Sequence, residues 1–164
     1  MQKILILISL LALVGCVEQV KGPSRDQVEP VSAVELLRKQ HKDELTEWQK
    51  LQLAIIFTES KGNPNAIGSA GDSGVYQMLP CYVAEANRVS GSNYSHEDAF
   101  DIDYAIDIFN RLQSHYNSEK DIEKAIAHHN KSSVYKATVL RNLELVERME
   151  VVRQKLIEYD SDNH

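Results

Sequence analysis

The stretch that decides the fold is LQLAIIFTES at residues 51–60, followed by KGNPNA at residues 61–66. The first seven residues are largely apolar and lead into a segment rich in Gly, Pro and Asn, so we expect a buried helix that ends near Gly62. Glu59 is the carboxylate at this boundary. Contact with the preceding Ile and Phe side chains removes water from it, and desolvation favours the neutral form of a carboxyl group. The sequence therefore predicts a general acid at Glu59, the alternative being an ordinary solvent-facing Glu at a helix end.

Two later segments accompany Glu59 in a fixed order: GDSGVYQMLP at residues 71–80 and AIAHHN at residues 125–130. Together with residues 59–66 they resemble the lytic transglycosylases of the soluble-lytic (SLT), goose-lysozyme-like group. That family shows Glu-Ser followed by Asn-Pro-x-Ala, then Gly-Leu-Met-Gln with a nearby Pro, then Ala-Tyr-Asn. The resemblance covers roughly residues 46–145. The matching residues are Glu59 and Ser60, Asn63 to Ala66, Gly74 and Gln77 with Pro80, and Asn130.

The resemblance implies an enzyme that cleaves the β-1,4 bond between N-acetylmuramic acid and N-acetylglucosamine in peptidoglycan. Glu59 would first protonate the leaving oxygen and then accept the proton of the sugar 6-hydroxyl, which closes a 1,6-anhydro ring. The chain departs from the family at His129, which replaces the usual Tyr, and at 131–132, where Lys-Ser replaces Ala-Gly. The residues expected to bind substrate are Ser60, Gly74, Gln77, His129, Asn130 and Tyr135.

Several of these residues have a structural interpretation that the sequence leaves open. Gln77 has an amide that can donate to sugar groups or brace its own loop. Gly74 permits close approach of the backbone to the saccharide or a turn with positive φ. Ser60 either holds the Glu59 carboxylate or the substrate, or is an ordinary hydroxyl at a helix end. Tyr135 either faces Glu59 or is an ordinary aromatic residue of a helix. His129 is expected to hydrogen-bond the substrate or Glu59.

Asp72 offers a second carboxylate near Glu59 along the chain. It would position water and give lysozyme-like hydrolysis, since glycosidases normally use two carboxylates. Its Asp-x-Gly setting is also typical of a turn. A third alternative is a peptidoglycan-binding lipoprotein without turnover, because His129 and the residues after Asn130 differ from the family.

Composition and motifs argue against several other classes of function. The chain has 164 residues, enough for one domain, and a net charge of −6 without a basic run, which argues against a nucleic-acid partner. His128 and His129 are adjacent, so on a helix they diverge rather than converge on one ion. The chain has neither a His-Glu-x-x-His motif nor a phosphate-binding loop motif, and we expect neither a metal nor a cofactor. The sequence does not address the oligomeric state.

The N-terminus predicts export and anchoring. One Lys precedes an apolar run over residues 4–14, which is too short to cross a bilayer but suits a signal peptide. LVGC at residues 13–16 resembles the bacterial lipoprotein box, so residues 1–15 would be removed, Cys16 lipidated and the protein held at a membrane of the cell envelope. Residues 16–31 are expected to be a flexible tether. Cys81 then has no partner, and we expect a small buried residue there.

Residues 32–160 are expected to form a mostly α, lysozyme-like domain, with a short β-hairpin near the Gly74 loop. Capping signals occur at Ser32 with Glu35 and at Thr46 with Gln49. Further helix starts are expected at Pro80, Ser95 and Asp121. Helical periodicity covers residues 103–116 and 134–159. In the last helix the predicted inward residues are Val139, Leu143, Val146 and Val151.

Overall fold

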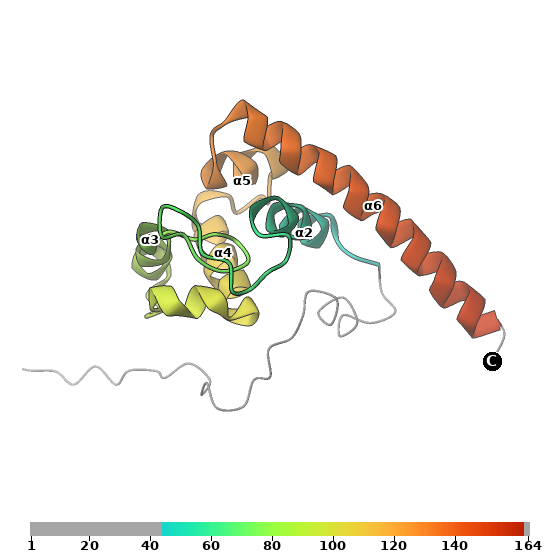
Figure 1. The fold of residues 1–164 in the computed structure, drawn as a ribbon, viewed down its shortest axis with the longest axis horizontal. Coiled ribbons are helices and arrows are strands. Elements are labelled where there is room, and N and C mark those ends of the chain that lie inside the picture. Colours follow the sequence, from blue (N-terminus) through green and yellow to red (C-terminus); the bar gives the residue numbers. More distant parts are fainter. Residues whose placement is uncertain (1–43, 163–164) are drawn as a thin grey trace, which may run out of the picture.

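The computed structural model describes residues 44–162 (Figure 1). The helix expected after Ser32, the tether and Cys16 lie outside this range. The elements are α2 (Glu47–Glu59), α3 (Pro80–Ser90), the 3-10 helix η2 (His96–Phe100), α4 (Ile102–Tyr116), α5 (Ile122–His129) and α6 (Ser133–Asp162). The predicted mostly α fold is confirmed. None of the helices in residues 44–162 is long and apolar enough to cross a membrane.

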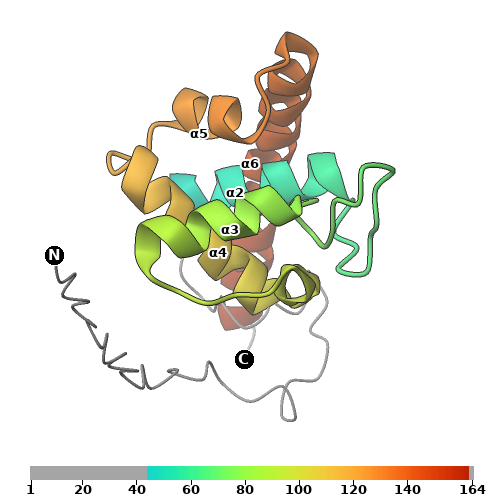
Figure 2. The ribbon, with the colours of Figure 1, turned by 90° about the vertical axis from the view of Figure 1, so that its left-hand side faces the viewer.

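Helix α2 lies at the centre of the domain and presents its apolar face to the core. It begins with the predicted capping box, in which Thr46 accepts from the Gln49 amide and the Gln49 side chain accepts from Thr46. Leu51, Ala54 and Ile55 are completely buried. Helix α6 packs along α2, while α3 packs against α4 (Figure 2). The stretch at residues 51–60 therefore forms the central helix, with Glu59 as its last residue.

The predicted helix starts at Pro80, Ser95 and Asp121 are confirmed, since each depends on residues close together in the sequence. Pro80 opens α3, and Gly91 ends it in the left-handed conformation. Ser95 and Asp98 form a capping box at η2. The Asp121 side chain accepts from the Lys124 amide at the start of α5.

The loop between α2 and α3 carries two isolated antiparallel bridges instead of a regular hairpin. Ser73 pairs with both Ile67 and Met78, and no longer strand forms in residues 44–162. Ser73 donates to the Met78 carbonyl at 3.0 Å and accepts from the Met78 amide at 2.8 Å. The loop therefore folds back on itself beside the end of α2.

Two expectations about burial are wrong. Cys81 is exposed rather than buried, because it lies in the first turn of α3 on the side away from Val83 and Ala86. In α6 the inward positions are Val139, Leu143, Val146 and Glu150, and Val151 is exposed. Glu150 is accommodated because its carboxylate accepts hydrogen bonds from Arg153, Gln154 and the Leu45 amide.

The C-terminal half of α6 extends beyond the other helices (Figure 1). Apolar residues recur on it at alternating spacings of four and three, and all are exposed: Leu145, Met149, Val152, Leu156 and Tyr159.

Candidate active site

Glu59 lies at the C-terminal end of α2, where its side chain is 18% exposed. The preceding Thr58 anchors this end of the helix, since its hydroxyl donates to the Ala54 carbonyl and accepts from the Asn142 side chain of α6 at 2.9 Å. The carboxylate therefore projects from a fixed helix end and keeps limited access to solvent. This combination suits a group that must meet a substrate from one side.

His129, the last residue of α5, contacts Glu59 directly. Its Nε2 atom lies 3.2 Å from Glu59 Oε1 and 3.0 Å from the Tyr76 carbonyl oxygen, and its side chain is 6% exposed. A carbonyl oxygen only accepts hydrogen bonds, so we assign the hydrogen of the ring to Nε2. His129 is thus a buried donor that faces the Glu59 carboxylate.

Tyr135, in the first turn of α6, faces the same carboxylate. Its ring stacks on His129 with 6.0 Å between the ring centroids, and its hydroxyl is buried. Burial, and next the negative charge of Glu59, raise the pKa of Tyr135. The hydroxyl lies within electrostatic reach of the carboxylate but does not meet hydrogen-bond geometry with it. Tyr135 is therefore a protonated donor beside Glu59 at neutral pH.

Ser60 and Gln77 brace the loop that follows α2. The Ser60 hydroxyl lies 2.9 Å from the Val75 carbonyl oxygen and accepts from the Gly62 amide at 3.1 Å. The Gln77 side chain donates to the carbonyls of Ala66 at 3.1 Å and Gly74 at 2.9 Å. These contacts engage both donors of the Gln77 amide and leave its oxygen as the acceptor for a further group.

Gly74 is required by the packing of this loop. Its φ is +74°, and a Cβ atom at this position would lie 1.7 Å from the Ala99 carbonyl oxygen of η2. Both the left-handed backbone and the close approach exclude a side chain. The close approach is made to η2, and whether a saccharide also lies against Gly74 stays a prediction.

Asp72 is engaged in the turn before Gly74. Its Oδ1 atom accepts from the Ala70 amide at 3.2 Å, and its carboxylate occupies the space that a side chain at Gly68 would need. This arrangement fits the interpretation of Asp72 as a turn residue.

Asn130 follows α5 as its C-cap and is exposed. The Asn130 side-chain oxygen accepts from the Ser132 amide at 2.9 Å, and this hydrogen bond shapes the turn into α6. The bond uses only the oxygen of the side chain and not its NH2 group. The structure thus places His129 in contact with both Glu59 and Tyr135. Ser60, Asp72, Gly74 and Gln77 lie in the adjoining loop, and Asn130 follows His129.

Sequence reasoning missed two buried polar residues near His129, which are Tyr82 of α3 and Gln113 of α4. The Tyr82 ring meets the His129 ring edge-on at 5.7 Å, and Gln113 is 1% exposed. Nothing in one sequence separates such a tyrosine from an ordinary core aromatic. A Gln on the inward face of a helix is the weak signal that was available.

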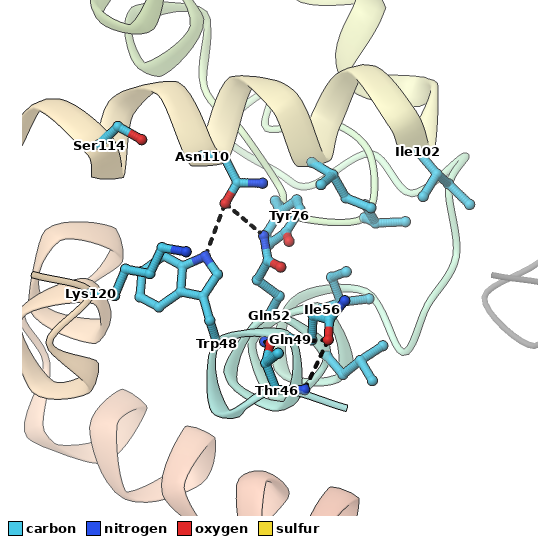
Figure 3. A pocket seen from close by; sticks show the side chains of 13 residues that line it. Thr46, Trp48, Gln49, Gln52, Ile56, Tyr76, Ile102, Asn110, Ser114 and Lys120 are labelled. Carbon is cyan, nitrogen blue, oxygen red and sulfur yellow. Dashed lines mark hydrogen bonds between the residues drawn. The ribbon is translucent and has the colours of Figure 1, made fainter. Parts of the chain in front are cut away.

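A separate pocket of about 390 Å³ lies between α2 and α4 (Figure 3). Trp48 and Gln52 both donate to the Asn110 side-chain oxygen there, at 3.0 and 3.1 Å. The pocket reaches the loop at Val75 and Tyr76, but none of the described residues that line it carries a carboxylate. It therefore offers no acid for glycosidic cleavage, and Glu59 stays the candidate acid. Within residues 44–162, no group of three or more His, Cys, Asp or Glu side chains could hold a metal ion.

Comparison with known proteins identifies the family of the domain. The family described as "Transglycosylase SLT domain" matches residues 37–142, which includes every element from α2 to α5 and the first part of α6. Comparison with curated proteins and with solved structures gave no significant match. The matched family is one of lytic transglycosylases, which supports an enzyme that acts on peptidoglycan. The chain belongs to the transglycosylase SLT domain family.

Proposed function

We propose that the protein is a peptidoglycan lytic transglycosylase in which Glu59 acts first as acid and then as base. The observation that carries the proposal is a partly buried carboxylate at a helix end, contacted by the donor His129 and faced by Tyr135. Donors on one side of the carboxylate hold its orientation and leave its open side for the sugar.

The reaction needs one carboxyl group in two successive roles. Glu59 gives its proton to the oxygen that links C1 of N-acetylmuramic acid to C4 of N-acetylglucosamine, and the C1–O bond breaks. The 6-hydroxyl oxygen of the same muramic acid then bonds to C1, and its proton returns to Glu59. Water is not consumed, and the attacking hydroxyl belongs to the substrate, so the second step is intramolecular and gains in effective concentration.

The alternative of lysozyme-like hydrolysis requires a carboxylate or another base that activates water. The contacts of Asp72 with the Ala70 amide and its packing over Gly68 favour a turn role over that of a base. We therefore expect Asp72→Asn to keep the product type and Glu59→Gln to lose general acid catalysis, which typically contributes about 10²–10⁴-fold.

Digestion of purified peptidoglycan followed by mass spectrometry of the muropeptides tests the proposal. We expect 1,6-anhydro ends from the wild-type protein and from Asp72→Asn, and almost no products from Glu59→Gln. Reducing ends that disappear in Asp72→Asn would establish the hydrolase instead. Equal clearing of a peptidoglycan gel by wild type and Glu59→Gln would remove Glu59 from the reaction, and no clearing by either would favour a binding protein.

We further propose that the enzyme works at the cell envelope, tethered through a lipidated Cys16. This rests on the apolar run at residues 4–14 and the LVGC sequence at residues 13–16. A tether of residues 16–31 would let the domain reach glycan strands near the membrane.

A further inference from the structure

Five buried side-chain atoms in the described part of the chain have no hydrogen-bond partner, and several surround His129. Native proteins rarely leave buried polar groups unpaired, so this group calls for an explanation. Rings of three tyrosines lie near the His129 ring, at centroid distances of 5.7 Å (Tyr82), 6.0 Å (Tyr135) and 6.3 Å (Tyr76). The five atoms are Tyr76 Oη, Tyr82 Oη, Gln113 Nε2, His129 Nδ1 and Tyr135 Oη.

The direction of each hydrogen bond follows from the partners already present. His129 Nε2 faces two acceptors, the Glu59 carboxylate and the Tyr76 carbonyl, so Nε2 carries a hydrogen. In an imidazole with that single ring hydrogen, Nδ1 is an acceptor. Nδ1 therefore requires a donor from the surrounding tyrosines. Among the three tyrosines, the Tyr82 ring lies nearest to the His129 ring and meets it edge-on, so we take the Tyr82 hydroxyl as this donor.

Gln113 completes the arrangement on the other side of Tyr82. Its side-chain oxygen accepts from Asn117 Nδ2 at 3.2 Å, so its free atom is the donor Nε2. Gln113 interacts with the Tyr82 hydroxyl, which can accept from Nε2 while donating its own hydrogen to His129. Asn117 is itself fixed, because it donates to the Asp121 carbonyl at 2.8 Å and accepts from the Asp121 amide at 3.0 Å.

We infer that a directed chain of hydrogen bonds runs from Asn117 through Gln113, Tyr82 and His129 to Glu59, and that Tyr82 and Gln113 are positioning residues for the catalytic carboxylate. The first and last links are present, from Asn117 to Gln113 at 3.2 Å and from His129 to Glu59 at 3.2 Å. Small side-chain adjustments would complete the two links through Tyr82, and every donor would then be directed toward Glu59. The chain fixes His129 with its hydrogen on Nε2. It thereby holds one oxygen of Glu59 and directs the other to the substrate.

The catalytic consequence rests on the proposed function, whereas the hydrogen-bond chain does not. One net hydrogen bond corresponds to a change in rate of about three- to tenfold. We therefore expect Tyr82→Phe, which removes only the hydroxyl, to lower kcat by about three- to tenfold and to leave KM within about twofold, since Tyr82 does not touch the sugar. Tyr76→Phe is the matched control, because it removes another buried, unpaired hydroxyl from a ring that lies farther from His129.

The decisive measurement is ¹⁵N NMR of the histidine rings in the full-length protein, with a kinetic comparison of both variants under conditions where each is folded. We expect the His129 hydrogen on Nε2, an Nδ1 signal shifted by an accepted hydrogen bond, and loss of that shift in Tyr82→Phe but not in Tyr76→Phe. Hydrogen on Nδ1, or an unchanged Nδ1 signal in Tyr82→Phe, would overturn the inference. An active Glu59→Gln would instead remove the proposed function and leave the NMR result intact.

Discussion

Glu59 and His129 end two different helices and meet there, with Oε1 of the carboxylate 3.2 Å from Nε2 of the imidazole. The imidazole also reaches the Tyr76 carbonyl, so one donor joins the end of α2 to the loop that carries Gly74 and Gln77. The family usually has Tyr at this position, and the histidine preserves a donor directed to the proposed acid. The departure from the family pattern is therefore compatible with the proposed role of Glu59.

Replacement of His129 tests the importance of that donor. His129→Phe removes it and leaves the Glu59 carboxylate and the Tyr76 carbonyl without their partner. Glu59 becomes charged as it gives up its proton in the proposed reaction, and a hydrogen bond to a charged group contributes about 1.5–3 kcal/mol, so we expect kcat to fall by about 10- to 100-fold. His129→Gln supplies an amide donor of similar reach and should retain most of the activity. Steady-state turnover of peptidoglycan measures both effects.

The adjacent His128 is exposed and provides the control. His128→Phe should leave turnover within about twofold, as is usual for a surface substitution away from special features. If His129→Phe turned over at the wild-type rate, the contact with Glu59 would have no catalytic role.

Gly74 gives a second prediction, which concerns stability. Alanine there must adopt φ near +74° and would place Cβ 1.7 Å from the Ala99 carbonyl oxygen. The backbone strain costs about 1–2 kcal/mol, and relief of the clash requires movement of η2, so we expect a total loss above about 3 kcal/mol. Gly71→Ala separates the two effects. Gly71 has φ +79° but nothing within 4 Å of its Cβ, and it should cost only about 1–2 kcal/mol.

Chemical denaturation followed by circular dichroism measures both alanine variants. Equal losses of unfolding free energy for Gly74→Ala and Gly71→Ala would show that the close approach to Ala99 is relaxed in solution.

The sequence predicted the helices well because their start signals are local. Thr46 with Gln49 and Ser95 with Asp98 each need only residues three positions apart, and both capping boxes are present. The choice of Val151 as an inward residue was wrong for a tertiary reason. Glu150 follows Val146 at a helical spacing of four, and the Leu45 amide and Arg153 together make its burial acceptable. No periodicity rule anticipates a buried carboxylate of this kind.

The sequence named the candidate residues of the site, but it could not predict how they are arranged. The resemblance identified Glu59, His129 and Tyr135, which the structure places together. The bracing contacts of Gln77 depend on a backbone with φ +48° and on two carbonyls that only the folded loop brings near. Tyr82 and Gln113 lie outside the recognisable motifs, so a single sequence gave no reason to connect them with Glu59.

The proposed anchor makes a third prediction, which can be tested in bacterial cells that express the full-length chain. Metabolic labelling with an alkyne-bearing fatty acid should mark the wild-type protein and place it in the membrane fraction. Cys16→Ser should lose both the label and the membrane association, because the thiol is the acylated group. Cys81→Ser, which alters the exposed second cysteine, should keep both. Label that persists in Cys16→Ser would contradict the proposed lipidation site.

Glu150 makes the stability of the domain depend on pH in a defined direction. Hydrogen bonds, above all those from Arg153, lower the pKa of Glu150 to about 2, against about 4.3 for an unperturbed Glu. A carboxylate whose pKa is lower in the folded state stabilises the fold above its unfolded pKa, and this contribution is lost as the pH falls through the folded value. Because the side chain is 4% exposed, solvent screening is weak, and we expect Glu150→Gln to cost about 2–3 kcal/mol at pH 7. The difference from wild type should shrink between about pH 5 and pH 2.

Glu147→Gln, at an exposed position of the same helix, is the control and should change the unfolding free energy by less than about 0.5 kcal/mol. Urea denaturation of the three proteins across this pH range decides the matter, since a constant difference between Glu150→Gln and wild type would mean that the Arg153 contact does not stabilise the charged carboxylate.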